Sequence, residues 1–146
     1  MKKFTTILAA ASLLTASLTA CRKDADAVII SPIAGDFLGK EACPPTTALA
    51  GSDYAVTIYN QADPNNGKVF IENIYGIGGR YEATVSGNTI TVATTRYSYK
   101  PGAAAALTGN ISATGTVDGA VLTLNYKLDG PLADECKFVG NRDARH

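Results

Sequence analysis

Hydrophobic and polar residues alternate along much of the chain after residue 34. Short runs rich in Val, Ile, Thr and Tyr recur roughly every ten residues and are separated by residues typical of turns. Because side chains of a strand point alternately to its two faces, this period of two puts one face in a core and the other in solvent. The pattern predicts an all-β fold with eight strands, at residues 35–43, 54–61, 68–74, 79–86, 89–98, 107–117, 120–128 and 134–140.

The faces of several predicted strands follow from the same alternation. Apolar residues occupy every second position, and the positions between them carry mostly Thr, Glu and Lys. The residues expected to face the core are Tyr54, Val56, Ile58, Tyr81, Ala83, Val85, Ile90, Val92, Leu122, Leu124, Tyr126 and Leu128.

The segments between the predicted strands are short and rich in turn residues. Residues 64–67 read Pro-Asn-Asn-Gly, residues 86–88 read Ser-Gly-Asn, and Asp118 and Gly119 form a two-residue hairpin signal. Short connections join neighbouring antiparallel strands, so we expect an up-and-down meander. The links at residues 43–52 and 99–106 are longer, and we interpret the second as a loop.

The first 20 residues have a different pattern. Lys2 and Lys3 precede an uncharged stretch, residues 4–20, rich in Ala, Leu, Ser and Thr, which is typical of a secretion signal and short for a transmembrane helix. Residues 18–21, Leu-Thr-Ala-Cys, resemble the lipobox of bacterial lipoproteins. That resemblance implies cleavage before Cys21 and acylation of Cys21, and several acyl chains anchor a protein far better than one.

A charged run follows Cys21. Residues 22–26 read Arg-Lys-Asp-Ala-Asp, and either a solvated linker or a sequence similar to a lipoprotein surface-export signal would account for it. We therefore expect four parts: a signal peptide at 1–20, a lipidated tether at 21–33, a β-barrel domain at 34–140 and a disordered tail at 141–146. The protein would be anchored in the cell envelope, in the outer membrane, facing either the periplasm or the cell surface.

Two cysteines remain once Cys21 is assigned to lipid. Cys43 and Cys136 form an even pair in a compartment that permits disulfides, and metal ligation by such distant cysteines is the competing interpretation. Cys43 ends the first predicted strand and Cys136 lies in the last one. These strands would form opposite edges of an open sheet, beyond the reach of about 7 Å between the Cα atoms of a disulfide. A Cys43–Cys136 bond would thus require a sheet that is closed or folded over on itself.

The domain as a whole resembles small bacterial lipoproteins with a lipocalin-like β-barrel. The resemblance covers most of residues 33–140 and rests on Ile-Ala-Gly-Asp-Phe at 33–37, on Cys43, on the segments 71–79 and 85–91, and on the late Cys136. It implies a small closed barrel. Lipocalins open with Gly-x-Trp, whereas this chain has Phe37 at that position and contains no Trp.

Charge and size exclude several classes of function. Loss of Lys2 and Lys3 with the signal leaves 11 basic against 13 acidic side chains, so there is no basic excess to bind nucleic acid. Removal of 20 of the 146 residues leaves 126, enough for one domain with a core.

No residue set in the sequence has the composition of a catalytic or metal site. The only histidine is His146, at the C-terminal end, so neither a nucleophilic triad nor a Cys/His zinc site is indicated. Asp134 and Glu135 are adjacent carboxylates, but neighbours on a strand point to opposite faces. Residues 76–79, Gly-Ile-Gly-Gly, lack the Lys of a phosphate loop and are interpreted as a turn. We therefore expect a protein that is not an enzyme and holds neither a cofactor nor a metal.

Tyrosines near strand ends are the candidate binding residues. Tyr75, Tyr97 and Tyr99 lie close to predicted loops, where exposed aromatics would recognise a ligand. The favoured hypothesis is a lipid-anchored binding module for a small molecule, a glycan or a protein. The alternative is an inhibitor or envelope-stress lipoprotein acting on a protein such as lysozyme. Small residues on one face of the sixth predicted strand, Gly109, Ala113 and Gly115, leave open whether the barrel is hollow or filled by larger neighbours.

Overall fold

The computed structural model describes residues 33–45, 48–61 and 66–144, and it is all-β. The predicted signal peptide, Cys21 and the tether as far as residue 32 lie outside the described residues. The eight strands are β1 (Gly35–Ala42), β2 (Ala50–Asn60), β3 (Lys68–Glu72), β4 (Arg80–Ser86), β5 (Thr89–Tyr99), β6 (Leu107–Asp118), β7 (Val121–Asp129) and β8 (Asp134–Arg142).

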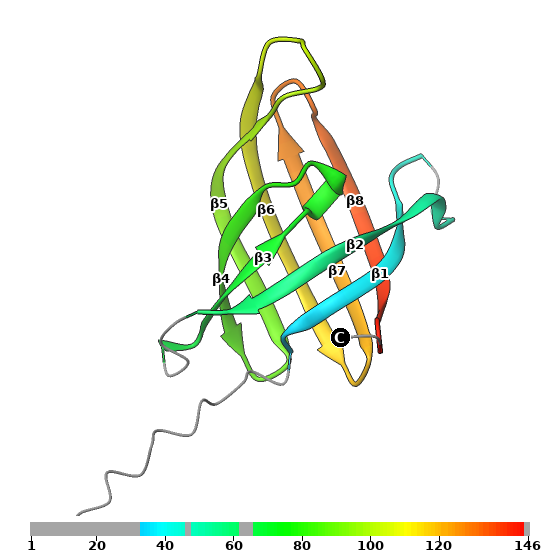
Figure 1. The fold of residues 1–146 in the computed structure, drawn as a ribbon, viewed down its shortest axis with the longest axis vertical. Helices are drawn as coiled ribbons and strands as arrows, with labels where there is room; N and C mark the ends of the chain where they lie inside the picture. The colour runs from blue at the N-terminus through cyan, green and yellow to red at the C-terminus, as the bar shows by residue number, and fades with distance from the viewer. Residues whose placement is uncertain (1–32, 46–47, 62–65, 145–146) are drawn as a thin grey trace, which may run out of the picture.

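The strands form one closed antiparallel barrel in chain order. Each strand pairs with the next, and β1 pairs with β8 to complete the ring (Figure 1). At this seam Phe37 lies opposite Arg142 and Gly39 lies opposite Gly140. The predicted all-β, eight-stranded up-and-down barrel is therefore confirmed, as is the loop at residues 100–106.

The seam explains where the strand boundaries differ from those expected. Asn141 and Arg142 were assigned to a tail, but they belong to β8 because they pair with Leu38 and Phe37 of β1. Ile33, expected to end the tether, is buried in the core. The ordered domain therefore extends beyond the predicted limits at both ends.

Apolar side chains from all eight strands meet inside the barrel. Of the twelve residues predicted to face the core, ten are buried, and Tyr54 and Val85 are half-buried. The interior contains Phe37, Val56, Ile58, Val69, Ile71, Tyr81, Ala83, Ile90, Val92, Tyr97, Ile111, Ala113, Val117, Leu122, Leu124, Tyr126, Leu128, Cys136 and Phe138.

Large neighbours occupy the space beside the small residues of β6. A Cβ atom on Gly109 would lie 2.7 Å from a ring carbon and from the hydroxyl oxygen of Tyr97, and one on Gly115 would lie 2.9 Å from a methyl group of Leu124. Ala113, the third small residue, is paired with Tyr126 of β7. The interior beside β6 is thus filled by side chains rather than left open for a ligand.

A disulfide joins the two edges of the sheet at the seam. Cys43 directly follows β1 and Cys136 lies in β8, and the two Cα atoms are 4.2 Å apart. The predicted pairing is confirmed, together with the closed sheet that it required.

The β3–β4 connection is held in a fixed conformation by its own polar groups. It contains the short 3-10 helix η2 (Ile74–Gly76), and Asn73 and Tyr75 have left-handed φ angles of 68° and 61°. The Asn73 side chain donates to the carbonyl of Ala55 at 2.7 Å and accepts from the Gly78 amide at 2.9 Å. These bonds anchor the connection to β2, as expected for a turn rather than a phosphate loop.

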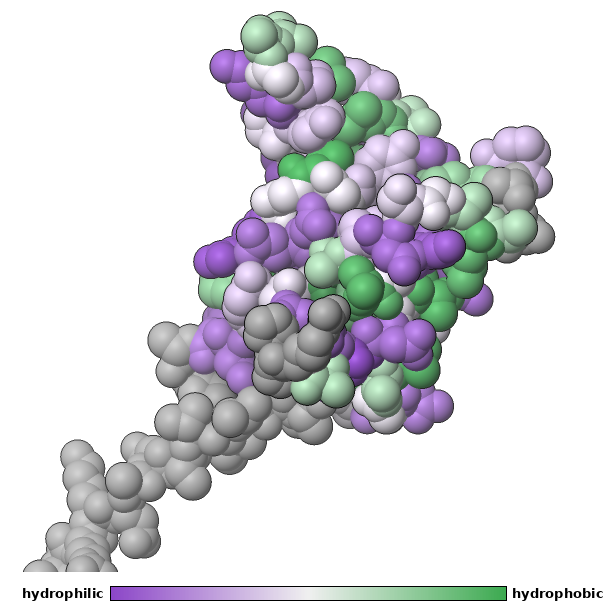
Figure 2. All heavy atoms as spheres, turned by 45° about the vertical axis from the view of Figure 1, so that its right-hand side comes forward, coloured by the Kyte–Doolittle hydropathy of each residue, from purple (hydrophilic) through white to green (hydrophobic). Residues whose placement is uncertain are grey.

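The outer face of β2–β4 is charged and its charges are paired. Lys68 lies 2.6 Å from Glu82, Arg80 lies 2.9 Å from Glu72, and the Arg80 guanidinium covers the ring of Tyr59 at 4.9 Å. On the face turned forward in Figure 2, a hydrophobic area is bordered by hydrophilic residues. No helix among the described residues is long and apolar enough to span a bilayer.

Candidate binding site

One polar cluster lies inside the barrel, close to the disulfide. Glu41 of β1 is opposite Phe138 in the β1–β8 register, so its side chain points inward. Its carboxylate accepts hydrogen bonds from the hydroxyls of Tyr54, at 2.9 Å, and of Tyr126. The two phenol oxygens are 3.4 Å apart. Both tyrosines therefore serve to satisfy a carboxylate that β1 brings into the barrel.

The surroundings of these tyrosines disfavour their ionised forms. Burial is the main cause that raises the pKa of Tyr126, followed by its hydrogen bond to Glu41. Burial also raises the pKa of Tyr54, and the negative charge of Glu41 adds to the effect. Neither phenol is therefore prepared to act as a base or nucleophile near neutral pH, since such groups need a lowered pKa or an adjacent base.

Tyr75 closes this cluster from the β3–β4 connection. Its ring meets that of Tyr126 edge-on, with centroids 6.1 Å apart, and its hydroxyl donates to Asp134 at 3.2 Å. Burial raises the Tyr75 pKa, and the hydrogen bond to Asp134 raises it further. Asp134 is half-buried whereas the neighbouring Glu135 is exposed, so the two carboxylates do not share a site.

The other two candidate tyrosines do not form an exposed surface with Tyr75. Tyr97 is only 1% exposed; its hydroxyl donates to the Asp129 carbonyl at 3.1 Å and accepts from the Leu132 amide at 3.2 Å. Its ring fills the space beside Gly109. Tyr99 is half-buried and packs against the core. The expectation of exposed rings fails for Tyr97 because a shift in the β5–β6 register, between Val92 and Thr95, turns it inward.

Glu41 and the two cysteines are the one group of potential metal ligands that the described residues bring together. Their ligand atoms lie within 4.8 Å of one another. Both sulfur atoms are spent in the disulfide, however, and a thiolate is the form that binds a metal. The Glu41 carboxylate already accepts hydrogen bonds from the hydroxyls of two tyrosines. The three residues therefore have the features of a structural link between β1 and β8.

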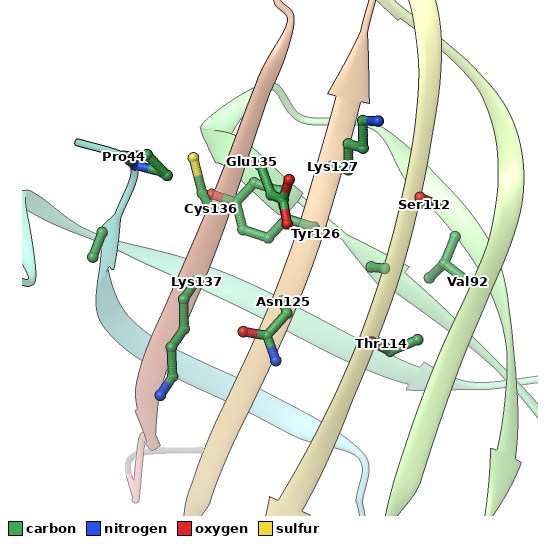
Figure 3. A pocket seen from close by; sticks show the side chains of 12 residues that line it. Pro44, Val92, Ser112, Thr114, Asn125, Tyr126, Lys127, Glu135, Cys136 and Lys137 are labelled. Carbon is green, nitrogen blue, oxygen red and sulfur yellow. The ribbon is translucent and has the colours of Figure 1, made fainter. Parts of the chain in front are cut away.

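A groove of about 450 Å³ lies on the outside of the barrel, across β6, β7 and β8 (Figure 3). Its lining combines outward residues of β6–β8 with four buried residues of the barrel wall, and residues 42 and 44, which end and follow β1, border it. The outward residues are Ser112, Thr114, Asn125, Lys127, Glu135 and Lys137, and the buried ones are Val92, Ala113, Tyr126 and Cys136. In register, Thr114 of β6 lies opposite Asn125 of β7, which lies opposite Lys137 of β8. The side chains in this outer row are Thr114, Asn125 and Lys137, and the next row holds Ser112, Lys127 and Glu135.

A second, smaller hollow of about 250 Å³ adjoins the groove. It is lined by residues of β5, β6 and β7, and it shares Thr114 and Asn125 with the groove. Its other side chains are hydroxyls, namely those of Thr89, Thr116 and Thr123. The two hollows together form a depression that crosses four strands, β5 to β8.

Three charged residues line the depression, the cations Lys127 and Lys137 and the carboxylate Glu135, which lies opposite Lys127 in the β7–β8 register. Lys127 lies 3.7 Å from Asp129, a loose and exposed ion pair. Lys137 makes no ion pair with any residue that the structure describes. Lys137 is therefore a cation with no ion pair among the described residues, and it lies at the β8 side of the depression, where an anionic group of a ligand would meet it.

The sequence contains a signal for this depression in its alternating threonines, which lie apart from the candidate tyrosines. Thr89 and Thr91, like Thr114 and Thr116, stand two apart on strands and so share a face. Alternating threonines mark the solvent face of a strand, but the register that aligns them across strands comes only from the structure.

Comparisons with protein-family models, curated proteins and solved structures returned no match to this chain.

Proposed function

We propose that the chain is a lipid-anchored, non-catalytic binding module of the bacterial cell envelope, and that it binds its ligand on the outer face of β6–β8. The lipobox-like residues 18–21 and Cys21 support the anchor. Acyl chains on Cys21 would hold the barrel at the membrane, with the outer membrane as the proposed location.

The observation that supports this binding site is that the interior beside β6 is filled by side chains whereas the outer face has a groove. Positions on β6 where small residues would leave internal space are filled by Tyr97 and Leu124. The outer groove, in contrast, has about 450 Å³ of free space, within the usual range of roughly 300 to 1,000 Å³ for ligand pockets. Its hydroxyl, amide and ammonium groups fit a polar ligand.

The ionisable groups inside the barrel support the proposal that the module is non-catalytic. The inward-facing carboxylates Glu41 and Asp134 both accept hydrogen bonds from tyrosines whose pKa values are raised. Such neutral phenols act as hydrogen-bond donors to the carboxylates. This arrangement stabilises a fold and offers no base paired with a nucleophile.

The anchor and the groove can be tested separately. Mass spectrometry of the protein from its own envelope should find Cys21 acylated at the new N-terminus, and a Cys21→Ser variant should lose the modification. An unmodified Cys21 would contradict the anchor.

For the groove, NMR screening of soluble sugars, short peptides and apolar compounds against the delipidated barrel should give polar hits. These hits should move the side-chain signals of Thr114 and Asn125. Hits confined to apolar compounds that move interior methyl signals, or the absence of any hit in the groove, would contradict binding at the outer face.

A further inference from the structure

Hydroxyl and amide side chains form two parallel rows on the outer face of β4–β7. The strand registers align them directly across the sheet, and each residue is exposed or half-buried. The first row is Thr84, Thr91, Thr114 and Asn125, and the second is Ser86, Thr89, Thr116 and Thr123. None of these eight positions carries a charge.

The sheet geometry makes the rows a regular grid. Neighbouring strands are about 4.8 Å apart, and alternate residues of one strand are about 6.8 Å apart. Threonine hydroxyls both donate and accept hydrogen bonds, and the Asn amide does the same. A ligand lying along the rows would therefore meet donors and acceptors at repeated intervals.

The corresponding face of β2–β4 shows that such rows are not general on this barrel. There, most cross-strand neighbours are charged or aromatic, as in the row of Tyr59, Phe70 and Glu82. The charges are paired, and Arg80 covers an aromatic ring. The uncharged grid thus distinguishes one part of the outer surface.

The depression lies where the grid is followed by Lys137, which makes no ion pair in the part of the chain that the structure describes. Both hollows share Thr114 and Asn125, and the first row continues from Asn125 to Lys137 of β8 (Figure 3). A ligand of matching shape is elongated, has many hydroxyls and carries an anionic group at the Lys137 end.

We propose that this depression is a binding site for a linear acidic glycan, with sugar hydroxyls along the threonines and a carboxylate at Lys137. The proposal rests on the proposed function, because it names the ligand class for the same outer face.

Extended peptides commonly bind by pairing with the free edge of a sheet. The pairing of β1 with β8 leaves this barrel without such an edge, which favours a ligand recognised through side chains.

The test is isothermal titration calorimetry of the folded, delipidated chain with a hexamer of galacturonic acid. Cellohexaose serves as the neutral glycan of equal length, and hexaglutamate as the acidic chain without sugar hydroxyls. We expect the uronic hexamer to bind most tightly, and its affinity to fall with added salt because exposed charges are screened.

Two groove variants and one matched control assign the contacts. Lys137→Gln should weaken the uronic hexamer about tenfold and change cellohexaose little, since hydrogen bonds to charged groups are the stronger ones. Thr114→Val with Thr116→Val keeps the side-chain shape and should weaken both hexasaccharides at least about fivefold. Thr108→Val lies on the same face of β6 outside both hollows and should leave binding unchanged.

The outcomes separate this proposal from the proposed function. The glycan assignment would be overturned if hexaglutamate bound as tightly as the uronic hexamer. It would also be overturned if the affinity for the uronic hexamer were the same in the groove variants as in the wild type. Another polar ligand that binds in the groove while the hexamer does not would also overturn it and leave the outer-face function standing. A hexamer that moves interior methyl signals would overturn both.

Discussion

Consecutive residues of β7 and β8 face two very different environments. Leu124 and Tyr126 point into the barrel, where one fills the space beside Gly115 and the other donates to Glu41. Asn125, between them, points outward into the depression on the surface. The same alternation on β8 puts Cys136 in the disulfide and Lys137 in the groove.

This difference separates the groups that hold the fold from the groups offered to a ligand. Inward residues are constrained by packing, because their removal leaves a cavity or an unsatisfied polar group. Outward residues of the same strands carry little of the stability, as is usual for surface positions. Substitutions one residue apart should therefore have opposite consequences for stability and binding.

The largest effect is expected at the seam. Cys43 and Cys136 are 93 residues apart, and the loop-entropy relation gives about 4.7 kcal/mol for a crosslink of that span. The Cys43→Ala, Cys136→Ala double variant should lose stability on this scale in urea unfolding monitored by circular dichroism. An unfolding midpoint equal to that of the oxidised wild type would contradict the structural role of the bond.

The next effect directly contrasts the two faces of β7. Leu124→Ala should lower the free energy of unfolding by about 3 kcal/mol, since the buried side chain leaves a cavity. Asn125→Ala should change it by less than about 0.5 kcal/mol while weakening ligand binding in the groove. Equal losses of stability in the two variants, measured by urea unfolding, would remove the contrast.

The inward tyrosines predict a loss of stability in alkali. Because the pKa values of Tyr54 and Tyr126 are raised on folding, the unfolded chain loses its phenol protons first as the pH rises. Stability is thus complete below the ordinary tyrosine pKa of about 10 and falls above it. Urea unfolding at several pH values should show this decline, and it should be shallower in a Tyr54→Phe, Tyr126→Phe variant. A decline equally steep in the variant would assign it to other groups.

The smallest effect on stability is expected at Lys137. It is exposed and has no ion pair among the described residues, so Lys137→Gln should leave the free energy of unfolding within about 0.5 kcal/mol of wild type. Lys68→Gln is the matched control on the ion-paired face, since it breaks the contact with Glu82. A loss at Lys137 larger than the loss at Lys68, measured by urea unfolding, would show that the groove cation supports the fold.

Local patterns in the sequence were sufficient to predict the barrel. Runs rich in Val, Ile, Thr and Tyr between turn residues located all eight strands, and Asp118–Gly119 marked the turn between β6 and β7. The pairing of two cysteines at opposite ends of the meander required closure, which the seam confirms. These features depend on period, turn chemistry and strand order, all of which can be read along the chain.

The candidate site depends on the way strands align, and that information is not local. The sequence predicts an exposed Tyr97 near a strand end, but a shift in the β5–β6 register turns its ring toward Gly109. Thr114 and Asn125 are unremarkable in sequence and become neighbours only through the β6–β7 register. Filling of the interior likewise depends on which large side chain faces each small one.

The most direct test of the account is to locate a bound ligand relative to the wall of the barrel. NOEs would be recorded between the bound uronic hexamer and a chain labelled at the methyl groups of Thr, Ile and Leu. The account predicts contacts with the outward methyls of Thr114, Thr116 and Thr123 and none with the inward methyls of Ile90 and Leu124. Contacts with Ile90 and Leu124 would instead place the ligand inside the barrel and contradict the assignment of binding to the outer face.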